Sequence, residues 1–383
     1  MGPLKGIKVV EIAGIGPAPV TGMMLADLGA EVILVERKGE NPNAAAIDPT
    51  KMGDVAFFKR GKQSIALDLK NPQAVELVLK LVAQADVLIE GFRPGVMERL
   101  GLGPDQCFEV NNRLVYGRMT GWGQSGPLAT SAGHDMNYLS ITGALHYCGL
   151  PGDTPYPTPT LLGDVGGGAM SLALGITSAL LHAERTGEGQ VIDAAICDGT
   201  IYNLTLMASL REQGIITEER GHDFFSAGSH WCNTYICADG RYITVQALEP
   251  NFYRELISRC GFEQDPDFGQ QHNRKLWPAA RKKMAGLFAA KTQAQWCEIL
   301  EGTDACFAPV LTLPEAAEHP HNQARNNFLN TDGLLQPAPA PKFSRTPQEV
   351  GGIPVSGEHN EAVLRQLDLS ADELAILNNQ GVF

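Results

Sequence analysis

The chain of 383 residues has few cations for its length. Its 30 Lys and Arg residues are outnumbered by 43 Asp and Glu residues, so its formal net charge is −13. Because a nucleic-acid binder normally carries a basic face, this shortage argues against a nucleic-acid partner. It also argues against attraction to an anionic membrane, although a locally basic pocket on an acidic protein can still bind an anionic small ligand.

Long hydrophobic runs are also missing. No uninterrupted apolar stretch reaches the ~18 residues that a membrane-spanning helix needs. The most apolar segment, residues 169–181, lies between glycines and a polar segment, and we predict that it is a buried helix. The first residues, MGPLKGIKVVEIAG, lack the basic and apolar regions of a signal peptide, so we expect a cytoplasmic protein.

The eight cysteines are scattered and form no Cys-x-x-Cys pair. In a chain of this size without a signal peptide, we expect them to be reduced and mostly buried. No His and Cys cluster has the spacing of a zinc site, so we expect no metal.

Alternating β-branched and helical segments occupy the first 120 residues. Strands are predicted at 7–13, 31–35, 63–69, 86–90 and 114–118, and helices at 20–29 and 72–85, with Asn71 as the N-cap of the second. Parallel strands joined by helices are typical of an α/β protein, and we predict a doubly wound sheet.

The later part of the chain changes in character. Helices are predicted at 135–146, 165–184, 193–213, 250–260, 276–290 and 371–378, and a β-hairpin at 234–247. Residues 334–350 are rich in proline and should run extended. We predict that residues 1–200 begin a large domain, that 201–224 form a linker, and that 225–310 form a smaller α+β domain.

A glycine turn follows the first predicted strand. Gly14 and Gly16 precede a helix, and Glu36 ends the second strand, an arrangement similar to a dinucleotide-binding fingerprint. The third glycine position is Pro19, so the match is weak. Either a nicotinamide or flavin site or a plain tight turn fits, and the pattern favours the plain turn.

Three ionisable residues lie in unusual local settings. His134 lies at the start of a predicted helix, Asp164 precedes three glycines that could let a thioester approach, and Glu249 precedes a proline after the hairpin. Each also has a structural explanation: a capping or core histidine, an N-cap aspartate, and a Glu-Pro helix start. Spacing alone does not bring them into one site.

Seven segments, in order along the chain, carry a resemblance to a known family: 14–32, 85–104, 118–127, 132–146, 163–170, 186–199 and 238–253. Through them the sequence resembles the α-methylacyl-CoA racemases. These belong to the family III CoA-transferase superfamily, together with formyl-CoA transferase and the carnitine CoA-transferases.

The resemblance implies the fold and the assembly. A Rossmann-like large domain would bind coenzyme A rather than NAD or flavin, and no cofactor beyond the CoA moiety of the substrate would be needed. The family forms an interlocked homodimer whose active site lies between the large domain of one subunit and the small domain of the other. Residues 311–383 would then return to the large domain.

The resemblance also implies the chemistry. The protein would epimerise the 2-methyl centre of a branched acyl-CoA in fatty acid metabolism, with His134 and Asp164 as the two acid/base groups and Glu249 supporting His134. Racemisation needs one such group on each face of the α-carbon, and N–H groups at the predicted helix start would stabilise the enolate. The positions matching the family's CoA and substrate contacts are Arg37, Leu67, Asp68, Leu69, Lys70, Gly91, Phe92, Arg93, Arg99, Gly133, Asp135, Met136, Asn137 and Tyr138.

Three points stay open. A CoA-transferase would use Asp164 as a nucleophile, through a mixed anhydride and an enzyme-CoA thioester; His134 favours the racemase, since two-face proton transfer needs a second acid/base group. An inert CoA-binding protein is a further alternative, against which His134, Asp164 and Glu249 argue. Residues 221–232 depart from the racemase pattern, and Phe224, Phe225 and Trp231 either reshape the acyl pocket or repack a linker.

Overall fold

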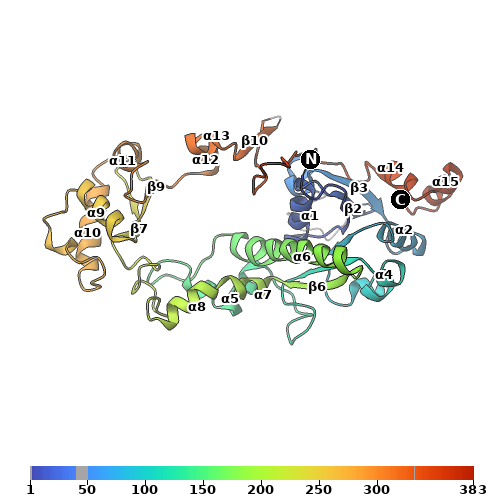
Figure 1. The fold of residues 1–383 in the computed structure, drawn as a ribbon, viewed down its shortest axis with the longest axis horizontal. Helices are drawn as coiled ribbons and strands as arrows, with labels where there is room; N and C mark the ends of the chain where they lie inside the picture. The colour runs from blue at the N-terminus through green and yellow to red at the C-terminus, as the bar shows by residue number, and fades with distance from the viewer. Residues whose placement is uncertain (1, 40–50, 332) are drawn as a thin grey trace. The chain divides into compact units, whose positions relative to one another are not determined.

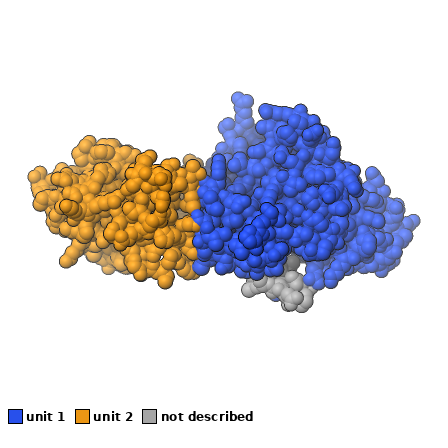
Figure 2. Space-filling model, turned by 90° about the horizontal axis from the view of Figure 1, so that it is seen from below, with its two compact units in different colours: residues 1–142, 158–203, 327–383 blue, residues 143–157, 204–326 orange. Residues whose placement is uncertain are grey.

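The structure is a computed structural model, which describes residues 2–39, 51–331 and 333–383. The chain divides into two compact units, which Figure 2 colours separately. Unit 1 comprises residues 1–142, 158–203 and 327–383, and unit 2 comprises residues 143–157 and 204–326. Each unit has its own hydrophobic core.

Unit 1 is built on a six-stranded parallel sheet with the order β3-β2-β1-β4-β5-β6. Figure 1 labels β2, β3 and β6 of this sheet. The strands are β1 (Lys8–Ile12), β2 (Glu31–Arg37), β3 (Lys62–Leu67), β4 (Val87–Glu90), β5 (Val115–Thr120) and β6 (Gln190–Ala195). This order is the one expected of a doubly wound α/β sheet, so the predicted fold class is confirmed.

Helices cover both faces of this sheet, which explains the continuous burial of its central strands. On β1, Val9 faces a core that includes α1 (Pro17–Asp27) and α6 (Met170–Thr186). The next residue, Val10, faces a second core formed with α2 (Pro72–Val82) and the C-terminal helices α14 (Asn360–Arg365) and α15 (Ala371–Asn379). The predicted caps are present: Asn71 accepts from Gln73 N–H, and Ser370 forms a capping box with Glu373.

The prediction of one helix over 193–213 was wrong at its start. Residues Gln190–Ala195 form strand β6, which pairs in parallel with β5 along its whole length. Helices α7 (Ile196–Asn203) and α8 (Thr205–Glu212) follow. The β-branched residues Val191 and Ile192 favour a strand at the edge of a sheet. The open edge of β5 offered this segment a pairing partner, so it forms a strand and not the start of a helix.

Residues 327–383 complete unit 1 from the far end of the sequence. The Arg60 guanidinium joins Asp27 to the Gln336 amide and the Pro337 carbonyl oxygen. Strand β3 lies at the edge of the sheet, and two of its N–H groups donate to late side chains: Ser64 N–H to His359 Nδ1, and Ala66 N–H to Asn360 Oδ1. These side chains cover an edge that would otherwise offer free pairing groups.

The apolar segment around α6 is only partly buried. By length and composition, Leu161–Thr186 could cross a membrane, but a helix on the face of a sheet passes the same test. One side of α6 packs against the sheet through Leu172 and Ile176. The other side exposes Met170, Leu174 and Leu181, so the prediction of a buried helix was wrong for that side.

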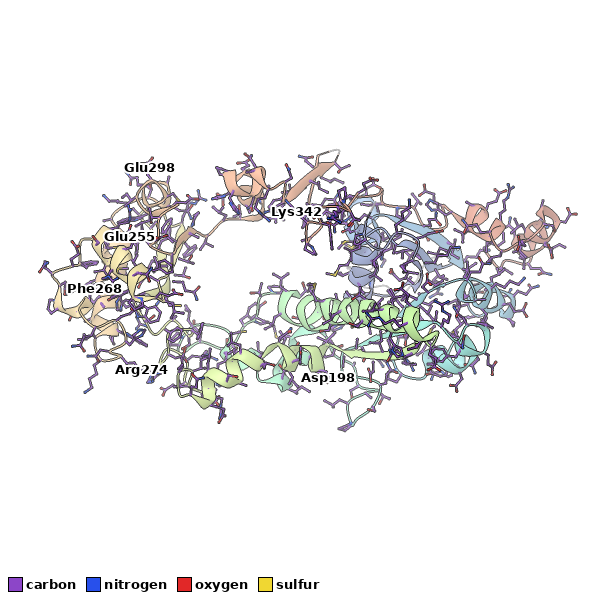
Figure 3. The ribbon with its side chains drawn as sticks, viewed as in Figure 1. Asp198, Glu255, Phe268, Arg274, Glu298 and Lys342 are labelled. Carbon is purple, nitrogen blue, oxygen red and sulfur yellow. The ribbon has the colours of Figure 1, made fainter. Side chains whose placement is uncertain are left out.

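Unit 2 has a three-stranded antiparallel sheet packed by helices. Its strands are β7 (Cys232–Ile236), β8 (Tyr242–Gln246) and β9 (Phe307–Pro309), and its main helices are α9 (Pro250–Arg259), α10 (Trp277–Phe288) and α11 (Gln293–Leu300). The core is aromatic: Phe268, labelled in Figure 3, stacks on Phe262 with ring centroids 4.3 Å apart. The hairpin and helices predicted over 234–290 are therefore present.

The unit boundaries differ from the expected domain limits at three places. Residues 201–224, expected to form a linker, are divided between unit 1, which extends to residue 203, and unit 2, which begins again at residue 204. Residues 143–157 join unit 2 because the Arg220 guanidinium donates to the carbonyl oxygens of His146 and Asp153. Residues 311–326 also join unit 2, where Arg241 pairs with Glu315 of α12 (Leu313–Glu318). These long-range contacts have no local pattern in the sequence.

All eight cysteines are free thiols. Four of them, Cys107, Cys197, Cys237 and Cys260, are buried, and the others are half-buried. Among the residues that the structure describes, no group of three or more His, Cys, Asp or Glu side chains could hold a metal ion.

Candidate active site

A cavity of about 450 Å³ opens at the carboxyl ends of β1, β2, β3 and β4. The order of the strands reverses between β1 and β4, and ligands of open α/β sheets bind at such switch points. The cavity therefore lies where the topology of unit 1 predicts a ligand.

Seven of the predicted CoA-contacting residues line this cavity together. They come from three different strand ends and are Arg37, Leu67, Asp68, Leu69, Lys70, Gly91 and Phe92. Arg93 and Arg99 lie just beyond, on the loop after β4 and on the short helix α3 (Val96–Arg99). Arg37, Lys70, Arg93 and Arg99 are all exposed, so their charges remain available to an anion in spite of the protein's net charge.

The glycine turn after β1 lines the same cavity, but the acidic residue that would complete a dinucleotide-binding site has other partners. Gly16 has a φ of 77° before α1, a conformation that needs glycine. Glu36 is buried, and both of its carboxylate oxygens accept from Lys59 Nζ at 3.1 Å, while Ser64 Oγ donates to one of them. The acid that should bind a ribose is thus already engaged.

Glu90, the last residue of β4, fixes the loop that enters the cavity. One of its oxygens accepts from Phe92 N–H at 2.7 Å, and the other accepts from Arg118 Nε at 2.9 Å. Burial raises the pKa of Glu90, and these two donors oppose that effect. The sequence context of Glu90, which is simply the end of an apolar strand, indicated no role for this residue.

The His134 segment is held by side chains of its own helix, α5 (Asp135–Thr142). The His134 N–H donates to Asn137 Oδ1 at 3.1 Å, and the Tyr138 hydroxyl donates to the Gly133 carbonyl oxygen. Helix geometry leaves the N–H groups of Asp135 and Met136 without intrahelical acceptors. Asn137 and Tyr138, predicted as substrate contacts, therefore position the exposed His134.

Trp122 also supports this segment and was missed by the sequence analysis. Its ring meets Tyr138 edge-on, with centroids 4.8 Å apart. A Cβ on Gly121 would lie 2.0 Å from the Tyr138 ring, so the glycine beside Trp122 makes room for this contact. The Trp122 Nε1 atom is buried and has no hydrogen-bond partner among the described residues. The Gly-Trp-Gly pattern was the only available signal.

Asp164 lies in η5 (Leu161–Ala169), a π-helical segment that leads into α6. We expected the three glycines after Asp164 to leave space for a ligand, and this was wrong for two of them, Gly167 and Gly168. Gly163, on the other side of Asp164, is equally confined. Added Cβ atoms would meet Asp135 Oδ1 at 2.2 Å from Gly163, Thr200 Oγ1 at 2.3 Å from Gly167, and Pro17 Cβ at 3.0 Å from Gly168. These glycines let α5, α7 and α1 pack closely around the segment that carries Asp164.

The Asp164 carboxyl has an unusual electrostatic environment. Burial raises its pKa to about 6, the negative charge of Asp135 adds to this rise, and the charge of His134 opposes it. The Asp164 N–H donates to Asp135 Oδ1 at 2.8 Å. Unit 1 thus brings His134 and Asp164, far apart in sequence, into one electrostatic cluster, which is suited to acid/base chemistry near neutral pH.

Glu249 belongs to unit 2. It is exposed and is the N-cap residue of α9, with Pro250 in the first turn, as the Glu-Pro pattern indicates. Its side chain makes no capping hydrogen bond. The support of His134 by Glu249 stays a prediction.

The divergent segment 221–232 packs largely inside unit 2. Trp231 is fully buried, and its Nε1 donates to the Gln271 carbonyl oxygen at 3.0 Å. Phe224 packs on Trp231 with ring centroids 5.1 Å apart, whereas Phe225 is exposed. A repacked linker accounts for Trp231 and Phe224, and only Phe225 is available to a ligand.

Comparisons with known proteins agree with this geometry. An alpha-methylacyl-CoA racemase of Mus musculus is 43% identical over 383 residues, covering 99% of this chain and 97% of its own length. The alpha-methylacyl-CoA racemase of Homo sapiens is 40% identical with the same coverage. A solved CAIB/BAIF family protein from Brucella suis is 28% identical, with a TM-score of 0.81 over 96% of this chain and 100% of that one. The sequence model described as CoA-transferase family III matches residues 4–360, and the chain belongs to that family.

Proposed function

We propose that the protein is a 2-methylacyl-CoA racemase. The observation that carries this proposal is the cluster of His134 and Asp164, in which the Asp164 pKa is raised to about 6. A carboxyl with this pKa exchanges its proton readily near neutral pH, as a group that alternates between acid and base must do. The identity of 40–43% to two alpha-methylacyl-CoA racemases supports the same activity.

In the proposed reaction, one of the two residues removes the α-hydrogen of the thioester. The electron pair moves onto the thioester oxygen and forms an enolate, which N–H groups at the start of α5 stabilise. The other residue then donates a proton to the opposite face of the α-carbon. The product is the other enantiomer, and the two residues have exchanged protonation states, so solvent protons must restore them.

The cavity at the strand ends is the proposed site of the CoA moiety. CoA is a polyanion, and the four exposed cations Arg37, Lys70, Arg93 and Arg99 provide local positive charge. The apolar part of the lining, from Leu67, Leu69, Phe92 and Leu100, suits the less polar part of the ligand. No further cofactor enters the proposal.

A CoA-transferase is the second candidate, because family members with this activity are also similar to the chain. One of them, an acetyl-CoA:oxalate CoA-transferase of Acetobacter aceti, is 30% identical over 95% of the chain. In that reaction the ionised Asp164 would attack the thioester carbonyl. A raised pKa reduces the ionised fraction, and a nucleophile has no need of His134, so both features favour the racemase.

The deciding experiment is incubation of one enantiomer of a 2-methylacyl-CoA with the protein in deuterium oxide. We expect deuterium at the α-carbon and loss of optical purity without any acceptor acid. His134→Ala should abolish both, while His321→Ala, at an exposed position on α13 (Pro320–Ala324), should leave both unchanged. Transfer of CoA to an added carboxylic acid without α-exchange would instead establish the transferase.

We also propose that the protein acts as a homodimer, interlocked as the family resemblance implies, in the cytoplasm. Large apolar side chains of unit 1 are exposed: Leu174 on α6 at 65% and Ile201 on α7 at 52%. A second copy of the chain would remove them from water. In this proposal Glu249 of one subunit supports His134 of the other.

Co-expression of His134→Ala chains with Glu249→Gln chains tests this arrangement. A mixed dimer would contain one site with intact His134 and Glu249 if the two residues come from different subunits. Racemase activity well above that of either variant alone is therefore expected. Activity no higher than the sum of the two variants would contradict the shared site, and sedimentation velocity would report the assembly independently.

A further inference from the structure

We propose that Asp135 is a positioning residue that ties the segment of His134 to the segment of Asp164 and keeps a negative charge beside Asp164. The inference rests on the proposed racemase function and extends it to a residue that the sequence analysis treated as a substrate contact. Two observations carry it, a hydrogen bond and a close packing contact.

The hydrogen bond joins two segments that are distant in sequence. Asp135 Oδ1 accepts from the backbone N–H of Asp164 at 2.8 Å. Asp135 directly follows His134 and begins α5, so one side chain fixes the distance between the backbones that carry the two acid/base groups. Such positioning matters because a misplacement of about 1 Å can reduce a rate by roughly a hundredfold.

The packing contact explains why the carboxylate reaches this place. An added Cβ on Gly163 would lie 2.2 Å from Asp135 Oδ1 and 3.3 Å from Leu139 Cδ2. Any larger residue before Asp164 would therefore displace the Asp135 carboxylate. Gly163 and Asp135 form a matched pair, in which the absence of one side chain makes room for the other.

The negative charge of Asp135 has a chemical consequence. It favours the protonated form of Asp164, in addition to the effect of burial, whereas His134 favours the ionised form. A carboxyl that is protonated in part of the population can act as the acid in one direction of the reaction. Asp135 thereby acts on the reaction through Asp164, without touching the reacting atoms.

The other ionisable groups near this segment have hydrogen-bond or ion-pair partners of their own. They are Tyr138 on α5, whose hydroxyl donates to Gly133; Cys197 and Asp198 on α7, which hydrogen-bond each other; Asp27 on α1, paired with Arg60; Arg118 on β5, paired with Glu90 and Glu98; and Asp193 on β6, which accepts from Gln124 N–H. Among the residues that the structure describes, Asp135 and His134 remain the charged groups that act on the Asp164 pKa.

The test compares Asp135→Asn with Asp135→Ala. Asparagine keeps an oxygen that can accept the Asp164 N–H but removes the charge, whereas alanine removes both. Asp105→Asn is the matched control, because Asp105 is an exposed acid in the first turn of helix α4 (Pro104–Val110). Racemisation of one enantiomer would be followed from pH 5 to 9, with kcat and KM measured separately.

For Asp135→Asn we expect the acid limb of the kcat/KM profile to move to lower pH by roughly 0.5–1 unit, because removal of a like charge lowers the Asp164 pKa. On the alkaline side kcat/KM should fall about threefold to tenfold, in line with the smaller protonated fraction. Asp135→Ala should lose about 10–100-fold in kcat, with KM changed less than about threefold, because misplacement of Asp164 affects the chemical step.

A titration that needs no activity separates this inference from the proposed function. The side-chain carboxyls of aspartate can be labelled with ¹³C, and the Asp164 signal can be assigned with Asp164→Asn. We expect the Asp164 pKa to fall in Asp135→Asn and to stay unchanged in Asp105→Asn. An unchanged Asp164 pKa together with an unchanged pH profile would overturn the inference, as would equal losses in both Asp135 variants without any shift. Absence of α-exchange in the unaltered protein would overturn the racemase function alone.

Discussion

Buried and half-buried carboxylates occur in two regions of unit 1 under opposite conditions. Inside the sheet, Glu11, Glu36 and Glu90 each contact a Lys or Arg side chain. At the end of the sheet, Asp164 has a second carboxylate as its neighbour, with the titratable His134 as the opposing group. Both regions contain carboxylates, but only inside the sheet is each carboxylate paired with a Lys or Arg side chain.

Burial acts on both regions in the same direction. It raises the pKa of Glu11, which is completely buried, and Lys62 opposes the rise through a contact of 2.6 Å. For Asp164, the neighbouring carboxylate adds to the effect of burial instead. A fixed cation therefore makes a buried acid a part of the structure, whereas a like charge leaves it with a proton to exchange.

The largest expected effect is on catalysis, in Asp164→Asn. The amide cannot exchange a proton, so α-hydrogen exchange and racemisation should fall about 10²–10⁴-fold. Deuterium incorporation measured by mass spectrometry checks this. A variant that retains more than a tenth of the exchange rate would remove Asp164 from the mechanism.

Asp164→Asn should not lower the stability of the fold, which would distinguish Asp164 from the paired carboxylates inside the sheet. The folded-state pKa of Asp164, about 6, lies above its ordinary value of 3.8, so ionisation costs stability as the pH rises between these two values. Above pH 6, Asp164→Asn should therefore unfold at an equal or higher urea concentration than the unaltered protein. A lower midpoint would indicate that the carboxylate is structural after all.

The next effect is on stability, in Lys62→Met. The substitution leaves the Glu11 carboxylate buried without its cation, and a loss of about 3–5 kcal/mol in the free energy of unfolding is expected. The double variant Glu11→Leu with Lys62→Met should recover most of this loss, because it removes the unpaired charge. Urea unfolding of both variants measures the difference, and equal losses would refute the role assigned to the pair.

The smallest expected effect is a difference in the free energy of unfolding between substitutions at two carboxylates that contact the Arg118 guanidinium. Arg118 contacts Glu90, which is fully buried, and Glu98, which is 43% exposed. Glu90→Gln should cost about 1–3 kcal/mol and Glu98→Gln less than about 1 kcal/mol, because solvent screens the exposed pair. Since Glu90 also holds the Phe92 N–H, only Glu90→Gln should raise the KM for acyl-CoA.

The sequence was sufficient to predict what depends on local pattern. The strand-helix alternation predicted β1 to β5, and polar residues before proline or an acidic turn predicted the caps Asn71 and Ser370. The candidates His134 and Asp164 were found from their glycine-rich settings and from the family resemblance. Apart from the family resemblance, each of these signals lies close in sequence to the feature that it predicts.

Features that depend on contacts between residues far apart in sequence could not be predicted. Strand β6 required the open edge of β5, and the exposed side of α6 could not be separated from its buried side by an apolar composition alone. The glycines beside Asp164 suggested room for a ligand, whereas Thr200 and Pro17 fill much of that room. The role of Asp135 depends on a hydrogen bond to a residue 29 positions later.

The edge of β3 has a consequence for synthesis of the chain. Ala66 on this strand donates to Asn360, 294 residues later. At about 5–20 residues per second, a ribosome needs roughly 15–60 s to make the residues between them. During that interval the β3 edge has no cover, although β2, the strand that pairs with β3, is already complete. A nascent chain stalled before residue 359 should therefore bind chaperones through this strand, and completion of the next few residues should release it.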